Sequence, residues 1–86
     1  MKVHFHKRFA NDFRRLNPKI QHAFEDRLGL FCTNPYQIKL NNHPLKGKWE
    51  GYRSINVSGD YRAVYKDICQ GEVIFTNIGS HGQLYS

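Results

Sequence analysis

The fold is decided by residues 51–66, which read GYRSINVSGDYRAVYK. Two runs in this stretch, Tyr52–Val57 and Asp60–Lys66, are rich in residues that favour strands, and the pair Ser58-Gly59 separates them. Two β-prone runs joined by a two-residue turn that contains glycine are typical of a β-hairpin. The sequence therefore predicts two adjacent antiparallel strands here.

Two further strands flank the hairpin in the sequence. A looser turn at Asp67–Gly71 leads to Glu72–Ile78, where three consecutive apolar residues predict a central strand covered on both faces. Near the N-terminus, residues 2–6 alternate, with Val3 and Phe5 facing one way and basic side chains the other. This period of two predicts a half-buried strand.

Apolar residues at helical spacing fill the sequence after the first strand. The first helix has one apolar face, at i, i+4 and i+7, formed by Phe9, Phe13 and Leu16. Asn17-Pro18 predicts the start of a second helix, because Asn is a good N-cap and Pro a good first helical residue. We expect this helix to end near Thr33-Asn34-Pro35, and its apolar stripe consists of Ile20, Phe24, Leu28 and Phe31.

The predicted order of elements is β-α-α-β-β-β, in a single domain at residues 1–86. The helices must bury their apolar stripes, so we expect a two-layer α+β fold with both helices packed on one face of a mostly antiparallel four-stranded sheet. The other face stays more open to a partner. Residues 35–50 form a long basic connection in this prediction, with Ile38, Leu40 and Leu45 as apolar anchors, and loops of that length are usually functional or disordered.

The charge of the chain favours a polyanionic partner. Lys and Arg number 13 against 7 Asp and Glu, which gives a net charge of +6. The excess is uneven, because basic residues outnumber acidic ones between Lys39 and Arg62. Such a distribution favours nucleic acid or an acidic protein segment as partner over a merely solvated basic surface.

The cysteines and the N-terminus predict a cytoplasmic protein without a membrane partner. Cys32 and Cys69 form no CxxC pair and are too few for the disulfide framework of a small secreted domain, so we expect both to be small apolar packing residues. The first ten residues, MKVHFHKRFA, contain no apolar segment of a signal peptide, and no run approaches the length of a membrane span.

Candidate proton carriers lie at His43 and His81, in predicted loops near strand ends, where a rigid scaffold often holds catalytic groups. RNA cleavage needs one group to take the 2′-OH proton, another to protonate the leaving 5′-oxygen, and a cation to stabilise the phosphorane. His43, His81 and Arg62 are candidates for these roles. Both residues also have a structural interpretation without a catalytic role: Arg62 could pair with Asp60, and Asp60 could only close the hairpin turn. The histidine and cysteine spacing indicates no metal site.

Residues 42–53 hold the densest mixture of functional side chains. The basic residues are Lys46, Lys48 and Arg53, and the large aromatic residues are Trp49 and Tyr52. Cations of this kind bind RNA phosphates, and aromatic rings can stack on unpaired bases. For the two aromatic residues, packing onto the sheet is the favoured interpretation. For the lysines, RNA binding and a solvated loop both stay open.

Four blocks of sequence together resemble the RelE/ParE superfamily of bacterial toxins, and most closely its YafQ-type and RelE/StbE-type ribonucleases. The blocks are His43-Pro44-Leu45-Lys46-Gly47, Gly51-Tyr52-Arg53, Gly59-Asp60-Tyr61-Arg62-Ala63-Val64-Tyr65, and Ile78-Gly79-Ser80-His81 with Leu84-Tyr85. Several blocks in the right order are more specific than one short motif. The predicted order of elements also fits, so the resemblance covers nearly the whole chain.

The resemblance implies a toxin of a type II toxin–antitoxin module that cuts mRNA, typically in the ribosomal A site, without a metal or a small-molecule cofactor. It implies mRNA, the ribosome and a neutralising antitoxin protein as partners. The catalytic set of YafQ-type toxins corresponds here to His43, Asp60, His81 and Tyr85. Arg62 is similar to a phosphate-binding arginine of RelE-type toxins.

The chain also departs from the pattern of the family. YafQ-type toxins carry an Asp and a His on the strand after Gly-Tyr-Arg, where this chain has Ser54 and Asn56. One alternative is therefore a catalytically degenerate member that binds only RNA or its antitoxin. The other is a ParE-like gyrase inhibitor, against which the two histidines argue, because gyrase inhibition needs no proton carriers. Which histidine is the base and which the acid stays open.

Overall fold

The computed structural model describes residues 1–85. The strands are β1 (Lys2–Phe5), β2 (His43–Pro44), β3 (Arg53–Ser58), β4 (Tyr61–Cys69) and β5 (Glu72–Ser80). The helices are α1 (Lys7–Arg14), α2 (Pro18–Thr33) and α3 (His81–Tyr85), with short 3-10 turns η1 (Ile38–Leu40) and η2 (Gly47–Trp49). The predicted α+β class is confirmed.

The sheet has five strands in the order β1-β5-β4-β3-β2, and it is mixed, because β1 runs parallel to β5 while the other three pairs are antiparallel. The predicted four-stranded sheet was therefore wrong in detail. The extra strand, β2, lies in the segment predicted as a long connection, where His43 pairs with Ser54 and Pro44 with Arg53. A strand of two residues has no apolar alternation to reveal it, and proline is tolerated on such an edge strand.

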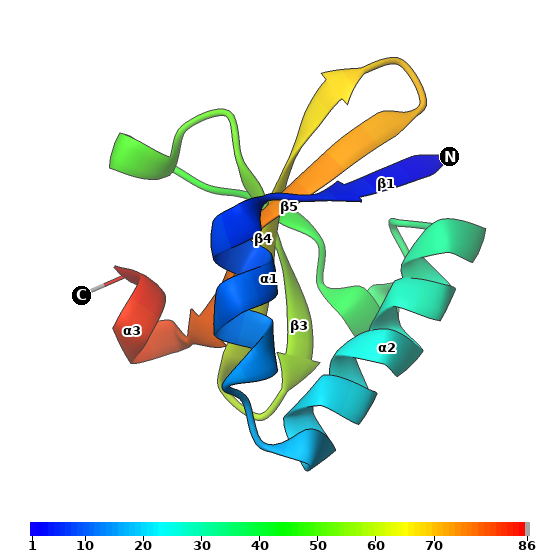
Figure 1. Ribbon diagram of the computed structural model, residues 1–86. Coiled ribbons are helices and arrows are strands. Elements are labelled where there is room, and N and C mark those ends of the chain that lie inside the picture. Colours follow the sequence, from blue (N-terminus) through cyan, green and yellow to red (C-terminus); the bar gives the residue numbers. More distant parts are fainter. Residues whose placement is uncertain (86) are drawn as a thin grey trace.

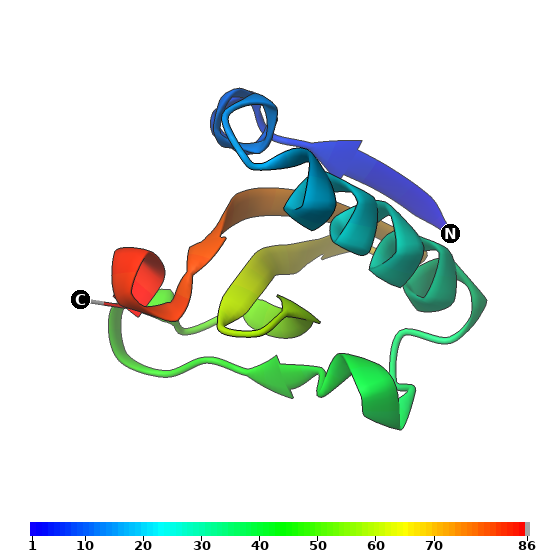
Figure 2. The same cartoon turned by 90° about the horizontal axis from the view of Figure 1, so that it is seen from below.

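Helices α1 and α2 cover one face of the curved sheet (Figures 1 and 2), with α1 packed on β5 and α2 on β3. The predicted cap of α2 is confirmed, because the side-chain oxygen of Asn17 accepts a hydrogen bond from the amide of Lys19 at 2.8 Å. Helix α1 ends at Arg14, so Leu16 lies beyond it but still packs half-buried against the core. Within residues 1–85, no helix is both long and apolar enough to cross a membrane.

The core between helices and sheet is mainly aromatic. Its central rings are 2% exposed or less and meet at centroid distances such as 4.9 Å for Phe31 with Tyr65 and 5.5 Å for Phe24 with Phe75. Asn42 Nδ2 donates to the Tyr65 hydroxyl at 2.7 Å. Burial raises the pKa of that hydroxyl above its usual value, with the Asn42 bond acting in the opposite sense. These buried contacts fix the helices against one face of the sheet.

The hairpin between β3 and β4 is confirmed, but its turn lies one residue later than predicted, at Gly59 and Asp60. The pairing shifts between Asn56 and Ser58, which marks a β-bulge, and Gly59 has a φ of 54°, in the left-handed region that glycine tolerates best. The carbonyl of Asp60 accepts the amide of His81 at 2.8 Å. The hairpin turn is thereby tied to the start of α3.

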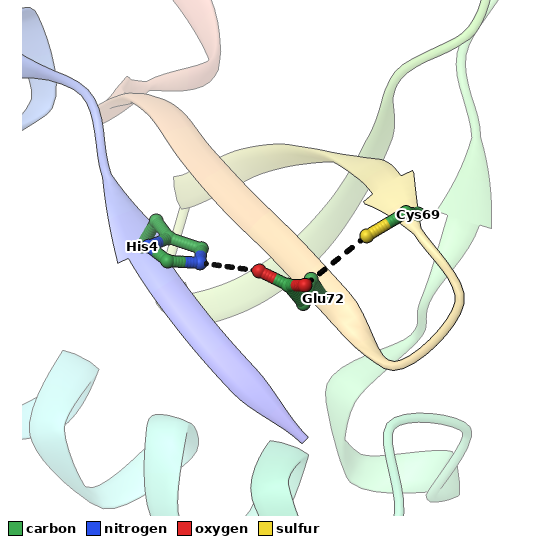
Figure 3. A network of polar contacts seen from close by, with 3 residues as sticks. All are labelled: His4, Cys69 and Glu72. Atoms are coloured by element: carbon green, nitrogen blue, oxygen red, sulfur yellow. Dashed lines mark hydrogen bonds and ion pairs between the residues drawn. The ribbon is translucent and has the colours of Figure 1, made fainter.

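A polar network at the far end of the sheet joins β1 to the β4–β5 hairpin (Figure 3). Glu72 contacts His4 at 2.9 Å and accepts from the Cys69 thiol at 3.2 Å. The hydrogen bond with His4, then that from Cys69, lowers the pKa of the Glu72 carboxyl, and the bond to Glu72 raises the pKa of the thiol. Cys69 and Cys32 are both exposed, so the prediction that they are packing residues was wrong.

Candidate active site

The face of the sheet away from α1 and α2 is built by strand alternation. On β3, Ile55 and Val57 point into the core, so Ser54 and Asn56 take the opposite face. Pairing sets His43 opposite Ser54, and Arg62 opposite Asn56. Three neighbouring strands therefore contribute polar side chains to one open surface.

A hollow of about 580 Å³ lies on this surface. Six predicted site residues line it: His43, Lys46, Lys48, Arg62, His81 and Tyr85. They come from β2, the η2 segment, β4 and α3, which are separated in sequence but adjacent here. The lining contains the imidazoles of two histidines and the charged groups of two lysines and one arginine. Among the described residues, no carboxylate lines it. Its electrostatics suit an anion.

The ring of His43 is held in one orientation by the backbone. Its Nδ1 lies 2.8 Å from the carbonyl oxygen of Asn41. Asn41 has a φ of 46°, the left-handed conformation that Asn tolerates better than most residues. A carbonyl oxygen can only accept, so Nδ1 carries the proton and the neutral ring has its lone pair on Nε2. This tautomer can take a proton from a ligand at Nε2.

Arg62 is fixed by the hairpin turn. Its Nη1 donates to the carbonyls of Gly59 at 2.8 Å and Tyr61 at 3.0 Å. Both of its hydrogen bonds within residues 1–85 use Nη1, so Nε and Nη2 are the donors left for a phosphate. The predicted ion pair with Asp60 does not form; instead, the guanidinium is anchored by neutral carbonyls and keeps its charge uncompensated.

Helix α3 brings His81 and Tyr85 to the hollow. The two rings lie edge to face at 4.8 Å, and the Tyr85 hydroxyl donates to Ser54 Oγ at 3.1 Å. Tyr85 also lies 6.2 Å from the ring of Trp49. The helix is thus attached to β3 through one hydrogen bond and to the hairpin turn through the His81 amide.

Two predicted site residues lie outside the hollow. Arg53 shares the helix-side face of β3, where its Nε donates to Asn42 at 2.8 Å and its guanidinium lies 5.5 Å from the ring centre of Tyr36. Asp60 is exposed in the hairpin turn and contributes its backbone carbonyl to the His81 amide. The side chains of Arg53 and Asp60 therefore do not line the hollow.

The sequence did not identify four further residues of the lining, which are Asn41, Leu45, Trp49 and Ser54. Trp49 was interpreted as a packing residue, and Ser54 only as a departure from the family. Ser54 is fully buried beneath Tyr85, and Asn56, the other departure, does not line the hollow. The one available signal was Asn41-Asn42 before His43, since Asn residues favour turns with positive φ.

Comparison with known proteins gives a family match over the whole chain. A family model described as "Bacterial toxin of type II toxin-antitoxin system, YafQ" matches residues 1–86. The mRNA interferase toxin YafQ of Escherichia coli K12 is 34% identical over 53 residues, which are 62% of this chain and 56% of that protein. The putative toxin YafQ of Haemophilus influenzae is 26% identical over 92 residues, covering 96% of this chain and 90% of that protein.

Solved structures agree with the fold. The crystal structure of YafQ from E. coli BL21(DE3) superposes with a TM-score of 0.82 at 21% identity, covering 99% of this chain and 98% of that one. A chain in the crystal structure of the E. coli DinJ-YafQ toxin-antitoxin complex gives a TM-score of 0.78 at 21% identity, covering 99% of this chain and 97% of that one.

Proposed function

The chain belongs to the YafQ family of bacterial toxins of type II toxin–antitoxin systems, and on that premise we propose that it is an endoribonuclease that cuts mRNA, the activity that the name of its E. coli relative states for that protein. We further propose that it acts without a metal ion or organic cofactor and cuts messages in the ribosomal A site. Such an activity belongs in the cytoplasm.

One observation carries the proposal: two imidazoles and a guanidinium line the same hollow on the open sheet face, beside two lysines. These are the groups that phosphodiester cleavage by the 2′-OH needs, a proton acceptor, a proton donor and a fixed cation. A hollow built only to bind RNA, or to bind a protein, has no need of two proton carriers.

His43 acts as the base in this proposal, because its neutral tautomer presents the lone pair of Nε2. It takes the 2′-OH proton as the 2′-oxygen bonds to phosphorus. His81, protonated, gives its proton to the 5′-oxygen as the P–O5′ bond breaks. The products are a 2′,3′-cyclic phosphate and a 5′-hydroxyl, and the histidines have exchanged protonation states. Arg62 stabilises the extra charge on the phosphorane through Nε and Nη2.

The remaining predicted residues support these three. Lys46 and Lys48 are exposed at the edge of the hollow and bind flanking phosphates. Tyr85 packs on His81 and orients its ring. Asp60 and Arg53 act indirectly, through the His81 amide and through the Asn42 contact. These side chains can supply both general acid–base catalysis and charge stabilisation, so the proposed mechanism uses no metal ion.

The proposed protein partner is a cognate antitoxin. Membership of a type II family supports this, as does the solved complex of E. coli YafQ with DinJ. An antitoxin segment laid over the hollow would neutralise the lysines and Arg62 and exclude RNA at the same time.

Cleavage in cells tests the activity. Wild type, His43→Gln, His81→Gln and the control His22→Gln are induced, and primer extension maps the ends on a reporter message. His22 is a suitable control because it lies exposed on α2, away from the hollow. We expect in-frame cleavage by the wild type and the control. In the two site variants we expect cleavage to fall about 10²–10⁴-fold while the melting temperature stays unchanged. Growth arrest with intact messages would indicate gyrase inhibition, and no arrest would indicate a binding-only protein.

A modified substrate separates the two histidine roles. Replacing the 5′-bridging oxygen by sulfur gives a leaving group that departs without a proton. With this substrate, presented on ribosomes, we expect His81→Gln to recover most of its lost rate and His43→Gln to recover none. Recovery by His43→Gln instead would reverse the assignment, and recovery by neither would remove His81 from the role of acid.

A further inference from the structure

A second hollow lies beside the first on the open face of the sheet. Its volume is about 570 Å³, and it lies between the start of α1, the η2 segment and strands β4 and β5. Lys48 and Trp49 line both hollows. An extended linear polymer that leaves the first hollow over these two residues therefore enters the second.

The second hollow is also cationic. Arg8, Lys48 and Lys66 line it together with His6, all four are exposed, and the described lining includes no carboxylate. His6 Nδ1 accepts the amide of Arg8 at 3.0 Å, which leaves Nε2 as its free ring nitrogen. Three permanent cations with no acidic neighbour in the lining form a site for more than one phosphate.

A row of aromatic rings joins the two hollows. Tyr85 lines the first, Tyr52 lines the second, and Trp49 lies between them at 6.2 Å from Tyr85 and 5.6 Å from Tyr52. Lys66 Nζ lies 5.4 Å from the centre of the Tyr52 ring. Aromatic faces next to cations are what binds single-stranded nucleic acid, because bases stack while phosphates pair. An acidic protein segment would use the cations and leave the rings unused.

We infer that the second hollow is a subsite for single-stranded RNA, which holds nucleotides next to the one that is cut in the first hollow. This inference rests on the proposed function. It assigns roles in substrate binding to Arg8, Tyr52 and Lys66, which lie outside the catalytic hollow. Half-buried Ile74 on β5 provides an apolar surface for a base at the same place.

Binding to RNA that cannot be cleaved tests the inference separately from catalysis. Fully 2′-O-methylated oligonucleotides lack the attacking hydroxyl, and their binding to the purified toxin is followed by fluorescence anisotropy at several salt concentrations. The variant Arg8→Gln/Lys66→Gln is compared with the control Arg14→Gln/Lys19→Gln. The control also removes one arginine and one lysine, but from α1 and α2 at positions outside both hollows. The probes are a dinucleotide and a strand of about ten nucleotides.

We expect Arg8→Gln/Lys66→Gln to bind the longer strand about tenfold more weakly at physiological salt, with the slope of log K against log salt reduced by about 1.4. The dinucleotide, which fits the first hollow alone, binds both double variants equally. Three results would overturn the inference. The control double variant could weaken binding of the longer strand equally, Arg8→Gln/Lys66→Gln could weaken binding of the dinucleotide as much as that of the longer strand, or the wild type could fail to bind the longer strand. Intact cleavage in cells alongside any of these results leaves the proposed function standing.

A third variant decides between RNA and an acidic protein segment. Tyr52→Leu keeps every charge and removes the ring, so we expect about fivefold or greater loss of affinity for the longer RNA strand. A poly-glutamate peptide binds Tyr52→Leu as it binds wild type. If Tyr52→Leu weakens neither ligand, or if the peptide binds more tightly than the RNA, the hollow is a docking site for an acidic segment instead.

Discussion

The hydrogen bond from the Tyr85 hydroxyl to Ser54 attaches α3, and with it His81, to the sheet. Ser54 is fully buried, so the variant Tyr85→Phe leaves a buried hydroxyl without its partner. An unsatisfied buried polar group costs about 1–3 kcal/mol. We expect Tyr85→Phe to lower the free energy of unfolding by about 1–2 kcal/mol, the lower part of that range, because Ser54 loses only the hydrogen bond that its oxygen accepts and keeps its O–H as a donor.

The partner variant and the double variant isolate the bond. Ser54→Ala leaves the Tyr85 hydroxyl half-exposed, where it reaches water, so its cost is about 0.5–1 kcal/mol. In Tyr85→Phe/Ser54→Ala neither unsatisfied group remains, and its stability falls close to that of Ser54→Ala alone. The resulting coupling energy equals the cost of Tyr85→Phe, about 1–2 kcal/mol, within the range for side chains in direct contact.

Urea denaturation measures these differences. For a domain of this size the slope is roughly 1 kcal/mol/M, so Tyr85→Phe shifts the midpoint by about 1 M or more. Fluorescence is a local probe, since Trp49 is the single tryptophan and lies 6.2 Å from Tyr85. If the two substitutions add, with coupling below about 0.3 kcal/mol, the bond does not hold α3, and the attachment of His81 to β3 is refuted.

Two further predictions concern other parts of the molecule. Asn17→Ala removes the cap of α2 and lowers the free energy of unfolding by about 1 kcal/mol in urea, whereas Asn17→Ser stays within a few tenths of wild type; equal losses would contradict capping. Because the bond to Glu72 raises the pKa of the Cys69 thiol, less thiolate forms near neutral pH, and iodoacetamide reacts more slowly at Cys69 in the wild type than in Glu72→Gln. Glu72→Gln shifts the pH profile of Cys69 alkylation to lower pH, and an unchanged profile in that variant would exclude the carboxylate as the cause.

Apolar spacing, turn residues and caps were enough to predict helices α1 and α2 and four of the five strands, β1, β3, β4 and β5. Phe24 and Phe31 are buried on the predicted stripe of α2, and the helix begins after its Asn17 cap. The core of a small α+β domain depends on these repeating contacts, so its pattern appears in the sequence. Ile38, predicted as an anchor of the connection, is 96% exposed, because that segment has no period to fix which side chains turn inward.

The remaining differences concern two short elements and the side chain of Arg53. Strand β2 and helix α3 are too short for any periodicity, and each is held by contacts with distant residues, His43 with Ser54 and Tyr85 with Ser54. Arg53 was predicted to bind RNA from its place in a basic segment. Alternation from the apolar residue Ile55 assigns Arg53 to the core-facing side of β3, and in the structure its side chain does not line the hollow.

The geometry of the hollow depends on backbone turns more than on contacts between its own side chains. Arg62 is held by the carbonyl of Gly59, and His81 is held by the carbonyl of Asp60, so one hairpin turn sets the position of both. His43 is oriented in the same way by the carbonyl of Asn41. Because peptide carbonyls do not titrate, they fix these side chains without adding a negative charge next to the phosphate that the site is proposed to bind. The hollow therefore keeps its full positive charge while its proton carriers stay in place, which a network of ion pairs with carboxylates could not achieve.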